Sequence, residues 1–142
     1  MEKDQLCFSI KKKLKKIGFF DEKFFLYFEE IDLFHRCKKN KLKVYYATKF
    51  KIKHLRASSI STDLNKINNL RAWHYMWSMF YFYKKNYSFL EAIKKIYILF
   101  IKDLIMMIFS IFIINKNIFY YRFNRLYGAI SSVIGLRSFK RP

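Results

Sequence analysis

The sequence predicts an α/β fold in two parts, with a few strands within residues 1–64 and long helices over residues 65–142. Hydrophobic residues make up 53% of the 142-residue chain, which is enough for a packed domain and too many for a disordered one. Three glycines and one proline are few for a loop-rich enzyme, and this favours helices. Near Asn65 long helical patterns replace short apolar runs, which separates the two parts.

The first part is expected to contain three strands and one regular helix. Residues 5–10, 42–48 and 49–55 are short apolar or alternating runs of the kind found in strands. Residues 11–18 are expected to form one or two helical turns that end at Gly18. Residues 29–40 begin with acids and end with cations, which matches a helix dipole, and Asp32 and Arg36 are spaced to pair.

The second part is expected to be helical throughout. A polar loop over residues 56–65 offers Ser61, Thr62 or Asp63 as the N-cap of the next helix. The apolar periodicity then predicts helices over residues 65–85, 89–114 and 118–133.

Residues 96–114 are the most apolar stretch and raise the question of a membrane. A span needs about 20 apolar residues, but Lys102 and Asp103 lie inside this stretch, and each costs about 2.5–3.5 kcal/mol at a helix centre. The pattern favours a helix lying on the inner membrane surface; a buried helix and a spanning helix are the alternatives. With no apolar signal-peptide core near the N-terminus, we expect a cytoplasmic protein, peripheral on the cytoplasmic membrane face.

The chain is strongly basic, with 29 Lys and Arg against 10 Asp and Glu and a formal charge of +19. Such a charge favours anionic partners, among them lipid head groups, phosphates and nucleic acid. Nucleic acid is the weakest of these candidates, because the basic residues are dispersed and no recognition motif occurs. Cys7 and Cys37 lack the spacing of a metal knuckle, and we expect free thiols in a reducing compartment.

Half of the carboxylates gather in the stretch "GFFDEKFFLYFEEIDLFHR", residues 18–36, where they alternate with aromatic residues. Acids in a first helical turn stabilise the helix dipole by about 0.3–1 kcal/mol each, and this alone is one explanation. The other is a general base beside an anionic substrate, because aromatic neighbours and a basic surround suit that role. Glu29 and Glu30 point about 100° apart on a helix and therefore have different roles.

In this order the residues resemble the acceptor-side half of family 2 nucleotide-sugar glycosyltransferases, most closely the rhamnosyltransferase-like branch. The segment "RAWHYMWSMFYFYKKNY" and the tail "GAISSVIGLRSFKRP" are similar to that branch as well, so the resemblance covers roughly residues 7–142. The chain departs from the family around Asn40 and Lys41, where a glycine is usual, and at Thr48, where a proline is usual. The matching positions of the first motif are Gly18, Phe20, Asp21, Glu22, Phe24, Phe25, Glu29, Glu30, Asp32, Leu33 and Arg36.

The resemblance implies the C-terminal half of a GT-A fold and an inverting sugar transfer in which Glu30 is the general base. Glu29 and Asp32 would hold the acceptor or the local helix. His54 would lie near a divalent metal, Mg or Mn, and the donor pyrophosphate; the alternative is a histidine that ends a strand. An acceptor-binding wall would come from Trp73, Tyr75 and Trp77, for which ordinary core packing is the alternative.

The family's donor site, with its Asp-x-Asp motif, has no counterpart in this sequence. We therefore expect a C-terminal part that is inactive alone. Its partners would be a nucleotide-sugar donor, a glycan or lipid-linked acceptor, the inner membrane surface and a separately encoded N-terminal half. The alternatives are a basic membrane-binding or nucleic-acid-binding module, and an inactive truncated remnant.

Overall fold

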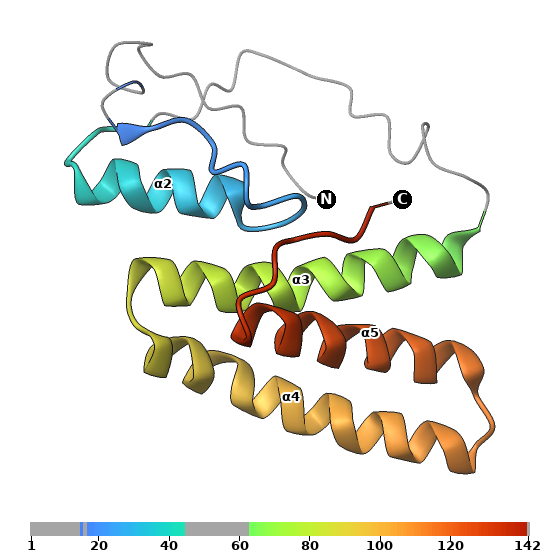
Figure 1. Ribbon diagram of the computed structural model, residues 1–142. Helices are drawn as coiled ribbons and strands as arrows, with labels where there is room; N and C mark the ends of the chain where they lie inside the picture. The colour runs from blue at the N-terminus through green and yellow to red at the C-terminus, as the bar shows by residue number, and fades with distance from the viewer. Residues whose placement is uncertain (1–14, 16, 45–62, 142) are drawn as a thin grey trace.

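The computed structural model describes residues 15, 17–44 and 63–141, and these form four helices (Figure 1). The helices α3, α4 and α5 pack on one another as an up-down bundle, and α2 lies on the other side of α3 from α4 (Figure 1). We call residues 17–44 the α2 segment. The bounds are α2 Glu29–Lys39, α3 Leu64–Asn86, α4 Phe89–Phe112 and α5 Lys116–Val133.

The predicted α/β fold, with the strands of a GT-A half, is wrong, because the described residues are helical and contain no strand. The predicted strands 5–10 and 49–55 lie outside the described residues. Of the predicted strand 42–48, only residues 42–44 are described, and they are not in a strand. The physical reason is that α3–α5 satisfy their backbone groups internally and cover one another's apolar sides, so this core closes without a sheet. Short apolar runs do not by themselves distinguish a strand from other buried segments.

The long helices were predicted from the sequence to within about two residues, and their N-termini show why. Asp63, one of the three predicted caps, accepts hydrogen bonds from the amides of Asn65 and Lys66. Ser88 caps α4 and Asn115 caps α5 in the same way. Each side chain satisfies amides that a helix leaves unpaired at its start.

The bundle core lies where the three long helices meet. Met76 and Phe80 of α3 pack there against Ala92 and Ile96 of α4 and Ala129 of α5. The adjacent Gly128 brings α5 against the α3 backbone, because a Cβ at this position would lie 2.1 Å from the carbonyl oxygen of Trp73. A methyl group there would force the two helices apart.

The charged pair within the apolar helix α4 is divided between core and solvent. Asp103 is buried, with its side chain only 1% exposed, and it accepts from Arg122 and Arg125 of α5, each at 2.6 Å. Lys102 is exposed. Among the helices of the described part, none is both long enough and apolar enough to cross a membrane.

Candidate functional site

The helix α2 begins in an unusual way. Tyr27 and Phe28, the two residues before it, both have left-handed backbones with φ near 65° and 67°. Phe28 is the N-cap, and its side chain makes no capping hydrogen bond. Consecutive non-glycine residues in this region are strained, and such strain gathers at functional sites. Glu29 and Glu30 follow directly, with Glu29 half-buried and Glu30 exposed.

Asp32, predicted to hold the acceptor or the helix, is fully buried and hydrogen-bonded within the protein. It pairs with Arg36, as its spacing predicted, and accepts from Lys85 and Asn86 of α3 at 2.8–3.0 Å. Burial would raise the pKa of Asp32, but the hydrogen bonds from Asn86, Lys85 and Arg36 outweigh it, so its pKa lies below the ordinary value. This geometry makes Asp32 an ionised anchor between α2 and α3.

Arg36 connects the same anchor to the start of the α2 segment. Its guanidinium donates to the backbone carbonyls of Ile17, Gly18 and Phe19 at 2.6–2.8 Å. Gly18 has a φ of 81°, and a Cβ there would lie 3.3 Å from Arg36 Nη1. The glycine and arginine of the sequence motif are therefore neighbours that fix the chain before α2.

Asp21 forms a second anchor on α3. It accepts from the Lys23 amide, the Tyr81 hydroxyl and the Lys85 ammonium at 2.8–3.0 Å. Burial would raise the pKa of Asp21, but its hydrogen bonds, led by that from Lys85, lower it overall. Burial and the bond to Asp21 raise the pKa of Tyr81. Lys85 thus joins Asp21 and Asp32. Glu22, the residue after Asp21, is exposed.

The three aromatic residues predicted to form one acceptor wall lie on two sides of α3. Trp73 and Trp77 are buried and stack on each other at 6.3 Å, and Trp77 donates its Nε1 hydrogen to the Leu136 carbonyl. Tyr75 lies on a different side, where it is 36% exposed. The structure therefore does not bring Tyr75 together with the two tryptophans.

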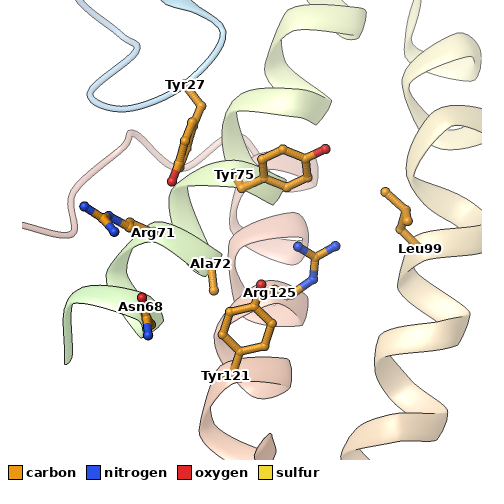
Figure 2. A pocket seen from close by; sticks show the side chains of 8 residues that line it. All are labelled: Tyr27, Asn68, Arg71, Ala72, Tyr75, Leu99, Tyr121 and Arg125. Carbon is orange, nitrogen blue, oxygen red and sulfur yellow. The ribbon is translucent and has the colours of Figure 1, made fainter. Parts of the chain in front are cut away.

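Tyr75 instead faces an open pocket of about 500 Å³, which we call the tyrosine pocket. Figure 2 shows its lining side chains, which come from the loop before α2 and from all three helices of the bundle. Tyr75 is in ring contact with Tyr27 at 5.8 Å and Phe28 at 6.0 Å, and the Arg125 guanidinium lies 5.3 Å from its ring centre. The lining residues are Tyr27, Asn68, Arg71, Ala72, Tyr75, Leu99, Tyr121 and Arg125.

A larger cavity of about 1070 Å³ lies between residues 20–23, α3 and the C-terminal tail, and we call it the basic cavity. Trp77 and Tyr81 supply its aromatic wall. Five cations line it against two carboxylates, so it suits an anionic group better than a neutral one. The charged lining residues are Asp21, Glu22, Lys23, Lys84, Lys85, Arg137 and Arg141.

The predicted metal site is not tested by this geometry, because His54 lies outside the described residues. Within the described ranges, no three His, Cys, Asp or Glu side chains gather in a way that could hold an ion. Asp21 and Asp32 are bound to Lys85, so they do not fit a divalent cation. Cys37, as expected, is a free and buried thiol.

The structure contains two buried polar residues, His74 and Asp103, whose structural roles were not predicted from the sequence. His74 is fully buried, with Nε2 at 2.8 Å from the Lys140 carbonyl and Nδ1 at 3.3 Å from Ser138 Oγ. Burial, with repulsion from Arg141 and Lys140, lowers the pKa of His74 to about 4. The other group is Asp103, whose only signal was its unfavourable place in an apolar helix.

Comparison with protein-family models, curated proteins and solved structures finds no match for this chain. The resemblance to family 2 glycosyltransferases therefore rests on the ordered motif residues and the two similar segments of the sequence alone.

Proposed function

We propose that this chain is the acceptor-side part of an inverting glycosyltransferase, in which Glu30 is the general base. The observation that carries the proposal is the start of α2. Tyr27 lines the tyrosine pocket, and the strained backbone of Tyr27 and Phe28 leads into the first turn of α2, where Glu30 is exposed. Strain of this kind is kept where it positions a group for chemistry.

The roles of the motif residues support this assignment. Asp21, Asp32 and Arg36 are hydrogen-bonded to α3 or to the preceding backbone, so they act as positioning residues. Glu30 lies in the same helical turn as the anchor Asp32 and is exposed. A general base has to reach the proton of its substrate, and an exposed carboxylate on a fixed helix meets this requirement.

The tyrosine pocket suits a glycan acceptor. Tyr27 and Tyr75 are both more than a third exposed and offer ring faces for the C–H surface of a sugar. Asn68 and Arg71 of the same lining supply hydrogen-bond donors for hydroxyl groups. Aromatic walls with a few polar groups are the usual composition of small-molecule sites.

The chemistry assigned to Glu30 is a single displacement. Glu30 takes the proton from an acceptor hydroxyl as its oxygen bonds to the anomeric carbon of the donor sugar. The bond from that carbon to the nucleotide phosphate breaks, and the nucleoside diphosphate leaves with the electron pair. The donor sugar, carried by a nucleotide, would be bound by a separate N-terminal half, and the acceptor would be a lipid-linked or cell-surface glycan.

A transfer assay tests the proposal. The chain is combined with a separately expressed donor-binding half from the reading frame directly upstream, and transfer from nucleotide-sugars to glycans is followed by mass spectrometry. We expect Glu30→Gln to lower kcat by about a hundredfold or more, because general bases contribute on the order of 10²–10⁴. Tyr75→Ala is expected to raise KM, and the exposed Glu22→Gln is the matched control. Absence of transfer in the pair, or transfer that Glu30→Gln leaves unchanged, would contradict the proposal.

A further inference from the structure

The end of the hairpin between α4 and α5 exposes an unusual number of large apolar side chains. We call residues 105–114 the α4–α5 tip. Phe112 is 78% exposed and Ile114 is 83% exposed. Isolated exposed apolar residues are normal, but a contiguous group marks an interaction surface. The exposed members are Ile105, Ile108, Phe109, Ile111, Phe112, Ile113 and Ile114.

The backbone at this tip is strained, and the end of α5 shows the unstrained alternative. The amide of Asn115 bonds to the Ser110 carbonyl, which leaves Ile114 in the left-handed region with a φ of 52°. The end of α5 has the same hydrogen-bond pattern, with Gly135 at the equivalent position. Glycine is the ordinary residue at this position, and a β-branched residue there is an outlier. Ile114 therefore does not stabilise the turn, and its exposed side chain requires another explanation.

The charge around the tip favours an anionic partner. No Asp or Glu follows Asp103 in the sequence, and Asp103 itself is buried and paired. Lys102 and Lys116, both exposed, border the tip on its two sides. An apolar patch bordered by lysines matches the acyl and phosphate layers of an anionic bilayer.

The position of the tip argues against the donor-binding half as its occupant. The α4 helix lies on the far side of α3 from α2 (Figure 1). A donor half that packs against the α2 segment would lie on the opposite side of the bundle from the tip. The helical part of the tip, residues 105–112, is about 12 Å long, less than half of a hydrocarbon core of about 30 Å, so the tip is too short to span a bilayer and long enough to enter its surface.

We propose that the α4–α5 tip docks this protein on an anionic membrane surface. Phe112 and Ile114 enter the acyl layer, while Lys102 and Lys116 meet lipid phosphates. The contact is made by one end of the hairpin and not by the whole of α4, because the exposed Lys94 and Lys95 interrupt the exposed apolar residues Leu90, Tyr97 and Ile98 of its first turns. The inference does not depend on the proposed sugar transfer.

Vesicle co-sedimentation of the full chain tests the docking surface, with phosphatidylcholine vesicles that contain or lack phosphatidylglycerol. We expect binding to the anionic vesicles, weaker binding in high salt, and little binding to phosphatidylcholine alone. Phe112→Ser and Ile114→Gly are each expected to weaken binding about tenfold. Ile134→Ser, which changes a similarly exposed isoleucine at the other end of α5, is the control and should stay within about twofold.

Ile114→Gly also separates docking from folding. Because glycine relieves the left-handed strain, the thermal midpoint of this variant should equal or exceed that of the parent while vesicle binding falls. Three results would overturn the proposal. They are absence of binding to anionic vesicles, equal losses in the tip and control variants, and a dimer in light scattering that the tip substitutions split without changing vesicle binding.

Discussion

The α2 segment and the α3–α5 bundle are stabilised by different kinds of contact. The bundle buries apolar and aromatic side chains and includes one ionic cluster around Asp103. The α2 segment combines aromatic contacts with α3, such as Phe24–Tyr81 and Phe28–Phe82, with an ionic link in which Lys85 lies between Asp21 and Asp32. Within the segment, Arg36 binds three backbone carbonyls. Apolar contact is not directional, whereas hydrogen-bonded ion pairs fix an orientation. The charged contacts show that Asp21, Asp32 and Arg36 of the motif position the segment, which is consistent with the proposal that Glu30 is the general base.

The largest effect is expected from breaking the one ionic cluster of the bundle. Asp103→Ala leaves Arg122 and Arg125 without their carboxylate in a buried position, and this should lower the free energy of unfolding by about 3–5 kcal/mol. Urea denaturation measures this change in the free energy of unfolding. Glu91→Ala removes an exposed pair with Lys94 on the same helix and should leave the urea midpoint nearly unchanged. Equal effects of the two substitutions would contradict the assigned role of Asp103.

A pH titration tests how the C-terminal tail is held on the bundle. The folded pKa of His74, about 4, lies below its unfolded value of 6.5, so the unfolded state binds more protons as the pH falls below 6.5. The stability from neutral His74 is complete above pH 6.5 and is lost towards pH 4, on the order of 2–3 kcal/mol. His74→Gln should flatten the loss of stability between pH 6.5 and pH 4 that urea denaturation measures. If the loss of stability between pH 6.5 and pH 4 persists in His74→Gln, another group causes it.

Hydrogen exchange can show whether the α2 segment opens independently of the bundle. Asp32→Asn removes the charge that Arg36 and Lys85 share, and we expect the free energy of opening in α2 to fall by about 2 kcal/mol while α3–α5 keep their protection. Glu22→Gln, in the same segment but exposed, should change it by less than about 0.5 kcal/mol. Loss of protection throughout the molecule would mean that the two regions form one cooperative unit.

How much of this could be predicted from the sequence depended on whether the contacts were local. The three long helices, the Asp63 cap and the Asp32–Arg36 pair follow from periodicity and spacing within a few residues. The α/β fold was wrong because short apolar runs were assigned as strands without a local feature that separates strand from coil. The two sides of α3 that hold Tyr75 and Trp77 follow from helix geometry, but the tyrosine pocket also needs Tyr27 and Tyr121. Those distant partners, like the tail that buries His74, have no local signal.

The smallest expected effect concerns the end of α2. Lys41 has a φ of 54° in the same position that Gly135 occupies after α5. Lys41→Gly should therefore raise stability by about 0.5–1 kcal/mol. Lys39→Gly, two residues earlier and inside the helix, should lower it by a similar amount, about 0.5–1 kcal/mol. Urea denaturation that gives both changes the same sign would contradict this account of the turn.

The most direct test of the central claim is an NMR titration of the chain alone with short oligosaccharides and methyl glycosides. If the start of α2 and the tyrosine pocket form an acceptor site, saturable shifts will appear at Tyr27, Glu30, Tyr75 and Tyr121, and Tyr75→Ala will abolish them. Nucleotide-sugars will cause no such shifts without the donor half. The absence of saturable shifts with any glycan, or shifts confined to the basic cavity around Tyr81 and Arg137, would contradict the claim.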